Sequence, residues 1–390
     1  MADINTVLAG ALRDRQALGL DRSLPSSIRP QIDMGSNDYL GLAHDPRLIE
    51  SAAKALRQHG TGSSGSRLLS GNVAIHEELE RGLAELKSTE AALLFSSGYQ
   101  TAIGVIPALA GGGDLIVSDE LNHACLIDAC RMSRATVRVY SHNDLSSARA
   151  ALVDRPRFRR CLILTDGVFS MDGDIADLAG LAAMRHEFNA WLMVDDAHGT
   201  GVLGQTGAGS VEFMGIGKNV DIQMGTISKA LGSAGGFIAA SQTVIDYLIN
   251  SARSFVYSTA PSPACAGAAL AALDILRKEP ERRETLAENA AHLRAGLRSI
   301  GLPIAHSQTP IIPIVMGSSD VVMRLADELR PRFGLIGIRP PTVPPGLSRL
   351  RVTVKATHTI AELDAVLEAF DQTLRKHGMR QYVLDGLATA

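Results

Sequence analysis

The stretch that decides the fold lies in the middle of the chain and reads Trp191-Leu192-Met193-Val194-Asp195-Asp196-Ala197-His198-Gly199. Four apolar residues run directly into two carboxylates and then a histidine. An unbroken apolar run of this length is typical of a strand that is buried on both faces. Ligands of open α/β sheets bind beyond the carboxyl ends of the strands. This stretch therefore predicts a candidate site at a strand end, although a capping aspartate and a surface histidine would give the same residues.

The same pattern repeats on both sides of this stretch, from residue 91 to residue 241. Short apolar runs occur at Leu93–Phe95, Leu115–Val117, Val137–Tyr140, Cys161–Leu164, Trp191–Val194 and Phe237–Ala240. Helical patterns between them cover Thr101–Ala110, His123–Met132, Ser146–Val153 and Ile175–Phe188. Strands that alternate with helices predict an α/β fold with a mostly parallel central sheet and helices on both faces.

The pattern changes toward the C-terminus. Helical patterns cover Ala264–Lys278, Glu281–Ser299, Val321–Phe333 and Ile360–His377, and Thr309–Met316 is expected to form a strand. Residues Arg349–Ala356 alternate strictly between polar and apolar side chains, which predicts a half-buried strand with Arg351 on its polar face. We therefore expect an N-terminal helix and arm (residues 1–45), a large α/β domain (46–275) and a smaller C-terminal α+β domain (276–390).

Composition excludes several classes of protein. With 46% apolar and 20% charged residues, the chain can bury a core and is not intrinsically disordered. The 38 basic and 41 acidic residues give a net charge of −3, so no nucleic-acid partner is expected. Four cysteines without a C-x-x-C pair predict neither a disulfide scaffold nor a metal site.

No contact with a membrane is expected either. Charged residues such as Asp3 and Arg13 interrupt what would be the apolar core of a secretory signal. The most apolar stretch, Ala264–Leu273, is much shorter than the roughly 20 residues that span a bilayer. We therefore expect a soluble cytoplasmic enzyme.

One glycine-rich loop raises an alternative from another class of enzyme. Residues Gly60–Gly65 satisfy G-x-G-x-x-G, a pattern of nicotinamide-dependent oxidoreductases. That site requires the loop to follow a strand, whereas Leu48–His59 has a helical pattern. The nicotinamide interpretation is therefore disfavoured but stays open, together with a non-catalytic binding protein that keeps the fold.

Several weak signals combine into a stronger one. Ser97-Gly98-Tyr99 ends one strand and opens a helix, where backbone N–H groups can bind an anion. His123 opens the next helical pattern, and Lys229 lies in the Gly225–Gly232 turn among small and hydroxyl-bearing residues. With Asp195, these are the parts that a pyridoxal phosphate enzyme needs: a phosphate cup, an acidic partner for the ring nitrogen and a Schiff-base lysine.

At these residues the chain resembles the α-oxoamine synthases, a branch of the fold-type-I pyridoxal 5'-phosphate enzymes. The matching segments follow one another in family order along nearly the whole chain. They are Ser36–Leu42 (SNDYLGL), Gly65–Leu68 (GSRL), Thr165–Asp174 (TDGVFSMDGD), Val194–Gly199 (VDDAHG) and Thr226–Lys229 (TISK). The resemblance implies a homodimer that condenses an amino acid with an acyl thioester and releases carbon dioxide.

The resemblance also assigns roles around the cofactor ring. Lys229 would form the Schiff base and Asp195 would pair with the ring nitrogen. His123 would stack on the ring, and Ser170 and His198 would contact the ring hydroxyl oxygen. The resemblance therefore implies a catalytic set of Lys229, Asp195, His123 and His198, and it implies Ser170 as a cofactor contact only.

The phosphate contacts are implied in the same way. The Gly98-Tyr99 turn and Thr226 would hold the phosphate within one subunit. Ser258 and Thr259 resemble the segment that reaches the phosphate across the family's dimer interface.

The substrate residues follow from the resemblance and from one independent observation. Asn37 and Arg351 resemble the pair that holds the carboxylate of the amino acid, and the alternation of Arg349–Ala356 independently places Arg351 on a polar face. Gly65–Leu68 with Ser70-Gly71-Asn72 is most similar to the branch that joins L-alanine to a pimeloyl thioester. Branches that use glycine or serine remain alternatives, and the acyl carrier, coenzyme A or a carrier protein, is left open. Asp166 precedes Gly167 where glutamate also occurs in the family, and no role is assigned to it.

Overall fold

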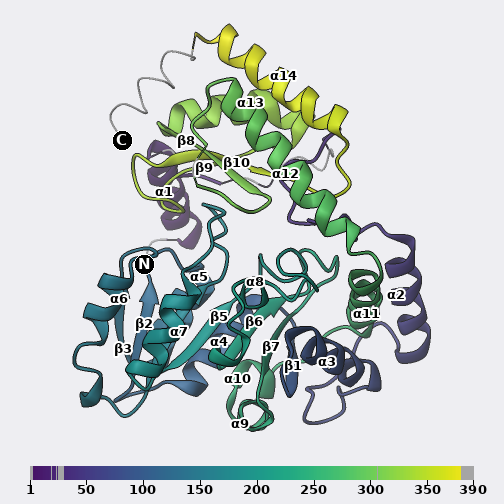
Figure 1. The fold of residues 1–390 in the computed structure, drawn as a ribbon, viewed down its shortest axis with the longest axis vertical. Helices are drawn as coiled ribbons and strands as arrows, with labels where there is room; N and C mark the ends of the chain where they lie inside the picture. The colour runs from purple at the N-terminus through teal and green to yellow at the C-terminus, as the bar shows by residue number, and fades with distance from the viewer. Residues whose placement is uncertain (1–2, 19, 23, 25–29, 305, 379–390) are drawn as a thin grey trace.

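A seven-stranded sheet forms the centre of the large domain (Figure 1). The computed structural model describes residues 3–18, 20–22, 24, 30–304 and 306–378. The strands, in their order across the sheet, are β1 (Ala91–Phe95), β7 (Gly236–Ala240), β6 (Ile222–Thr226), β5 (Trp191–Asp195), β4 (Cys161–Asp166), β2 (Leu115–Asp119) and β3 (Thr136–Tyr140). Strand β7 is antiparallel to β1 and β6, and the other neighbouring pairs are parallel. The predicted mostly parallel sheet is confirmed.

Helices cover both faces of this sheet. One face packs against α4 (Gly98–Leu109), α5 (Ala124–Ser133), α9 (Gln242–Ser251) and α10 (Arg253–Val256). The other face packs against α6 (Leu145–Leu152), α7 (Leu178–Glu187) and α8 (Ser210–Phe213). Adjacent strand residues such as Leu162 and Ile163 point into opposite layers, and both are buried. Double burial explains why these strands appear in the sequence as continuous apolar runs.

Strand β6 is the strand of the central sheet that the apolar pattern did not predict. Its sequence, Ile222–Thr226, contains a glutamine and a glycine and so lacks a continuous apolar run. Gln223 is nevertheless buried, because its side-chain amide donates a 3.2 Å hydrogen bond to the Lys87 carbonyl oxygen. A hydrogen bond to a residue distant in sequence therefore lets a polar side chain be buried in this strand, although the local sequence did not indicate a strand.

The smaller C-terminal unit contains a three-stranded antiparallel sheet. Its strand order is β8 (Ile311–Gly317), β10 (Ser348–Thr353) and β9 (Ile336–Ile338). Helices α12 (Glu281–Ser299), α13 (Ser319–Phe333) and α14 (Ile360–Lys376) surround it, and Figure 1 shows it above the large sheet. Helix α11 (Pro263–Lys278) packs against α2 (Pro46–His59) and α3 (Ala74–Lys87) and leads into α12. The expected division between residues 275 and 276 falls inside α11 and stays a prediction.

Two short 3₁₀ helices and an N-terminal helix complete the described elements. They are η1 (Arg155–Arg157), η2 (Gly217–Asn219) and α1 (Ile4–Ala17). Among the described residues, no helix is both long enough and apolar enough to cross a membrane.

The prediction that β10 is only half buried is wrong. All six residues of β10 are buried, with Arg351 only 4% exposed and Thr353 fully buried. The polar face lies against the large domain, because Arg349 forms an ion pair with Asp172 and the Arg351 Nε donates a 2.6 Å hydrogen bond to the Ser170 carbonyl oxygen. Polar and apolar residues do alternate along β10, but other parts of the protein cover both faces of the strand.

A fully buried ion pair supports the loop that follows β5. The Lys87 amine lies 2.8 Å from the Asp196 carboxylate, and neither side chain is exposed. Asp196 also accepts a 3.1 Å hydrogen bond from the Ser210 backbone N–H. The end of α3 is thereby joined to both ends of the loop between β5 and α8.

We predict that Lys87→Met destabilises the protein by roughly 3–5 kcal/mol, because it leaves the Asp196 carboxylate buried and unpaired. Urea unfolding of the two proteins measures this difference. Lys278→Met is the matched control, because the Lys278 amine pairs with Asp274 at the surface. The control should cost about 0–1 kcal/mol. Equal losses in the two variants would contradict the structural role of the buried pair.

Candidate active site

The carboxyl ends of the parallel strands surround a cavity of about 170 Å³. It is lined by Gly98, Tyr99, His123, Cys125, Asp166, Val168, Asp195, Ala197, His198, Met224, Thr226, Ser228 and Lys229. Asp166 and Asp195 end neighbouring strands and are paired in register across β4 and β5. Because parallel strands end at one edge, residues that are far apart in sequence meet here. Seven of the predicted site residues line this cavity: Gly98, Tyr99, His123, Asp195, His198, Thr226 and Lys229.

The start of α4 approaches the sheet closely at this edge. A Cβ atom on Gly236 of β7 would lie 2.6 Å from the Gly98 nitrogen and 2.5 Å from the Thr101 hydroxyl oxygen. Ser97 caps the helix, accepting a 3.1 Å hydrogen bond from the Gln100 N–H. The glycine at position 236 therefore lets the helix N-terminus, with its unpaired N–H groups and partial positive charge, reach the cavity.

Adjacent carboxylates after β5 have different surroundings. The Asp195 side chain lines the cavity and accepts a 3.1 Å hydrogen bond from the Ala197 N–H. The Asp196 side chain is held by Lys87 and Ser210 and does not line the cavity. This difference is consistent with the expectation that Asp195, rather than Asp196, meets a ligand.

Burial sets the protonation of the charged groups in the cavity. Removal from water lowers the pKa of the Lys229 amine, although the nearby Asp195 and Asp166 carboxylates oppose this shift. Burial raises the pKa of Asp195, against the opposing charge of Lys229. Such opposed shifts bring an amine and a carboxyl group toward a common pH range, which is a property of sites that transfer protons.

Burial favours the neutral form of both cavity histidines. Burial lowers the pKa of His123 and lowers that of His198 well below its ordinary value. The His123 Nδ1 atom accepts a 3.3 Å hydrogen bond from the Cys125 N–H and lies 2.9 Å from the Cys125 sulfur. A neutral imidazole has one donor and one acceptor nitrogen, so these contacts place the His123 proton on Nε2.

Asp166 is a cavity residue to which the sequence assigned no role. Its Oδ2 atom accepts a 3.2 Å hydrogen bond from the His123 backbone N–H, whereas Oδ1 is buried without a partner. Burial and then the charge of Asp195 raise the pKa of Asp166 well above its usual range. An unpartnered buried oxygen in a polar cavity indicates that a ligand group belongs there.

The Thr226 hydroxyl organises the turn that carries Lys229. It donates a 2.6 Å hydrogen bond to the Gly235 carbonyl oxygen and accepts a 3.1 Å bond from the Ser228 N–H. The Ser228 hydroxyl lies 2.6 Å from the Thr226 hydroxyl and lines the cavity. Ser228, which was not predicted, is therefore a further hydroxyl available to a ligand.

The residues predicted to bind a carboxylate form a second group beside this cavity. Arg351 Nη2 donates a 3.0 Å hydrogen bond to Asn37 Oδ1, and Arg351 Nε contacts the Ser170 carbonyl oxygen. None of these three residues lines the 170 Å³ cavity. Tyr39 connects the two groups, because its hydroxyl oxygen lies 2.6 Å from His198 Nδ1.

Ser258 and Thr259 do not line the cavity of their own chain. Thr259 forms an isolated bridge with Ser66, and its carbonyl oxygen accepts a 3.4 Å hydrogen bond from the Ser96 hydroxyl.

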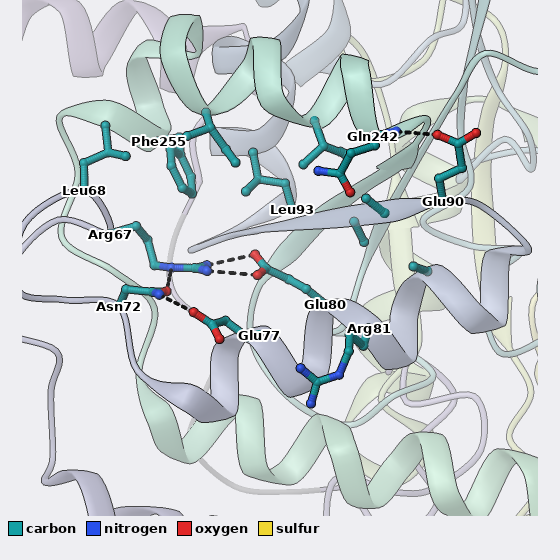
Figure 2. A pocket seen from close by; sticks show the side chains of 15 residues that line it. Arg67, Leu68, Asn72, Glu77, Glu80, Arg81, Glu90, Leu93, Gln242 and Phe255 are labelled. Carbon is teal, nitrogen blue, oxygen red and sulfur yellow. Dashed lines mark hydrogen bonds and ion pairs between the residues drawn. The ribbon is translucent and has the colours of Figure 1, made fainter.

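Larger hollows occur away from these groups. One of about 390 Å³ contains an ion pair between Arg67 and Glu80, with a nitrogen–oxygen distance of 2.9 Å (Figure 2). Arg67 also donates to Asn72, whose amide donates to Glu77. The Glu80 carboxylate accepts a hydrogen bond from the Leu94 N–H at the end of β1. These contacts give the Gly65–Leu68 motif a structural explanation, because its arginine anchors the turn to α3.

The hairpin that carries Ser170 is held by a charged histidine. The ring nitrogens of His142 lie 3.1 Å from an Asp119 oxygen and 2.9 Å from an Asp174 oxygen. Burial is the largest influence on the pKa of His142 and lowers it, but the hydrogen bonds and charges of the two carboxylates together outweigh burial and raise the pKa to about 10. Asp174 belongs to the hairpin, since its carbonyl oxygen accepts a hydrogen bond from the Phe169 N–H. The hairpin is therefore attached to the end of β2.

Comparison with known proteins adds an independent finding. The family model for class I and II aminotransferases matches residues 29–370. The chain is 49% identical over 365 residues to an 8-amino-7-oxononanoate synthase from Chromohalobacter salexigens. The aligned region covers 93% of this chain and 94% of that protein.

Solved structures agree with this match. A serine palmitoyltransferase from S. paucimobilis, with a bound PLP–myriocin aldimine, is 28% identical with a TM-score of 0.91 and covers 97% of this chain and 100% of that one. An 8-amino-7-oxononanoate synthase from Francisella tularensis is 27% identical with a TM-score of 0.76 and covers 89% of this chain and 98% of that one.

We predict that His142 stabilises the fold most strongly at low and neutral pH. Its folded pKa of about 10 lies above the ordinary value of 6.5. The stabilisation is therefore complete below pH 6.5 and is lost as the pH rises toward 10. Urea unfolding of wild type and His142→Gln from pH 6 to 10 should give a stability difference that shrinks as pH rises. A difference that is constant across this range would exclude a charged His142.

Proposed function

This chain belongs to the class I and II aminotransferase family, and from that premise we propose that it joins L-alanine to a pimeloyl thioester, with loss of carbon dioxide, to give 8-amino-7-oxononanoate. The enzyme uses pyridoxal 5'-phosphate, and its reaction is a step of biotin biosynthesis. The observation that carries the proposal is the convergence of Lys229, Asp195, His123 and His198 on one buried cavity next to the Arg351–Asn37 pair.

The cavity residues fit the cofactor. Lys229 would hold it through its amine, and the Asp195 carboxylate would pair with the ring nitrogen. The N-terminus of α4 and the hydroxyl of Ser228 suit the phosphate, because both can donate hydrogen bonds to an anion. The unpartnered Asp166 Oδ1 gives the cavity one further polar contact for a bound group.

The neighbouring residues would bind and orient the amino acid. The Arg351 guanidinium is buried without a carboxylate partner among the hydrogen bonds described for it, and its fork can bind two carboxylate oxygens. The Asn37 amide would supply a second polar contact. Together they would hold the alanine carboxylate at one end, so that its α-carbon lies toward the Lys229 cavity.

Lys229 would then move the α-proton. Burial lowers the pKa of its amine, which increases the neutral fraction that can accept a proton. Bound pyridoxal phosphate supplies an electron sink for negative charge at the α-carbon. Burial of Asp166, Asp195 and His198 in the cavity walls would keep water away from this proton transfer.

We predict that a substrate panel with mass-detected products identifies the reaction. Holoenzyme is mixed with L-alanine, glycine or L-serine and with pimeloyl, acetyl, succinyl or palmitoyl thioesters of coenzyme A, and with pimeloyl carrier protein. L-Alanine with a pimeloyl thioester should give 8-amino-7-oxononanoate, and the faster carrier identifies the natural donor. Lys229→Ala should give no product and no borohydride-fixed cofactor, whereas Lys218→Ala at the exposed η2 should match wild type.

A different productive pair would overturn the substrate assignment. L-Serine with palmitoyl coenzyme A would instead place the chain with the serine palmitoyltransferases that share its fold. Full turnover in Lys229→Ala would remove Lys229 from the mechanism.

We also propose a homodimer in which Ser258 and Thr259 reach the phosphate of the partner subunit. Their position outside their own cavity supports this arrangement. The bridge from Ser66 to Thr259 brings two exposed apolar segments together, in which Leu69 is 85% and Tyr257 is 73% exposed. Apolar side chains gathered in this way are typical of a surface that another chain covers.

We predict that two inactive variants restore activity when they share a dimer. One carries Lys229→Ala, and the other carries Ser258→Ala with Thr259→Ala. If the hydroxyls act across the interface, a mixed dimer contains one intact site, and co-expression should recover part of the wild-type turnover. Activity no higher than the sum of the separate variants would mean that these residues act within their own subunit or not at all.

A cytoplasmic location is proposed as well. All four cysteines are free, and Cys125, Cys130 and Cys161 are buried in the large domain. Free thiols are typical of compartments kept reducing by glutathione and thioredoxin.

A further inference from the structure

Tyr39 makes a close contact that the proposed roles leave unexplained. Its hydroxyl oxygen lies 2.6 Å from His198 Nδ1, and its ring meets the imidazole edge-on at 6.0 Å between centroids. Tyr39 is 1% exposed, although it belongs to the arm that precedes α2, more than 150 positions from His198 in sequence. A buried phenol normally needs a partner for its hydroxyl group, and here the partner is a cavity histidine.

We propose that Tyr39 is a positioning residue that fixes the proton of His198 on Nε2 and links it to the carboxylate-binding Arg351–Asn37 pair. This inference rests on the proposed function, which places His198 beside the cofactor and Arg351 beside the amino acid. It assigns Tyr39 no contact with either ligand.

The direction of the hydrogen bonds follows from the chemistry of the groups. Burial raises the pKa of Tyr39 to about 12, so the phenol keeps its proton. The charge of Arg351 and a hydrogen bond from its guanidinium, which can only donate, oppose this rise in the pKa of Tyr39. Arg351 is also close to the phenol through Asn37, because Asn37 Oδ1 accepts a 3.0 Å hydrogen bond from Arg351 and lies 3.4 Å from the Tyr39 oxygen. The phenol oxygen therefore accepts from Arg351, and its own proton is free to go to His198 Nδ1.

Competing partners are weaker. Asn37 Oδ1 lies 3.4 Å from the Tyr39 oxygen, at the limit of a hydrogen bond, and it already accepts a 3.0 Å bond from Arg351. The 2.6 Å contact to His198 is much shorter. With Nδ1 occupied as an acceptor, neutral His198 carries its proton on Nε2, as a donor into the cavity that it lines.

The surroundings of His198 favour a neutral ring. Burial and the positive charges of Lys229 and Arg351 act against protonation of both ring nitrogens. His198 therefore has to donate as a neutral imidazole, and its donor strength depends on the group that donates to Nδ1. A substrate carboxylate that accepts hydrogen bonds from Arg351 would weaken the hydrogen bond from Arg351 to Tyr39. Binding of the amino acid would therefore change the hydrogen bond that His198 Nδ1 accepts from Tyr39.

The first experiment needs no cofactor. Nitrogen NMR of histidine-labelled protein, with His198 assigned by loss of its signals in His198→Asn, reports which ring nitrogen carries the proton. Wild type and Tyr140→Phe should show His198 protonated on Nε2. Tyr140 is a matched control because it is also a buried tyrosine, located at the end of β3. Tyr39→Phe should give a mixture of tautomers.

The second experiment uses holoenzyme. In Tyr39→Phe, the apparent pKa of the cofactor's visible absorbance should shift by about one unit, which is a tenfold change in the proton equilibrium. Addition of L-alanine should change this pKa in wild type more than in Tyr39→Phe. The variant should lose kcat, roughly tenfold, with a smaller change in the KM for the thioester.

Distinct results overturn the proposal. His198 protonated on Nδ1 in wild type excludes it, and this measurement remains valid if Tyr39→Phe does not fold. A folded Tyr39→Phe with unchanged His198 tautomer and unchanged absorbance titration also excludes it. Failure of the wild type to bind cofactor would instead refute the proposed function, while the NMR result without cofactor would still decide the role of Tyr39.

Discussion

The structure depends on keeping an amine and two carboxyl groups away from water at the end of a parallel sheet. Lys229, Asp195 and Asp166 share one small cavity, and burial is the largest influence on the pKa of each group. Such an arrangement is costly without partners, so the surrounding elements have to hold it together. The buried Lys87–Asp196 pair and the Asn122 contacts behind Asp166 provide that support.

Buried charges also need partners where the polar face of β10, in the smaller domain, packs against the large domain. Arg349 and Arg351 would be ordinary surface residues on an isolated sheet. Against the large domain, Arg349 pairs with Asp172, and Arg351 contacts both the Ser170 hairpin and Asn37. The site is therefore assembled from the N-terminal arm, the large sheet and β10, and none of these parts contains it alone.

Much of the fold could be predicted because burial leaves a local pattern. Six apolar runs became strands of the central sheet, and the helical pattern before Gly60 formed α2, which removes the structural context that a dinucleotide loop requires. Strand β6 escaped prediction because Gln223 is satisfied by a distant carbonyl group. Ser228 and Asp166 also required the structure, because a hydroxyl or carboxyl group near a motif does not reveal which way it points.

The sequence by itself determined the alternation of strands and helices and the family order of motifs, and hence the fold and the cofactor, and it led to the proposal that Lys229 is the reactive amine. Those features depend on local apolar periodicity and on short motifs. The family resemblance already favoured Asp195 over Asp196, but only the tertiary structure gave the physical difference between them: Asp195 lines the cavity, whereas Asp196 pairs with Lys87. It also buried the polar face of β10 and brought Tyr39 to His198. These contacts join segments that are distant along the chain, so their geometry depends on how the domains pack rather than on any local pattern.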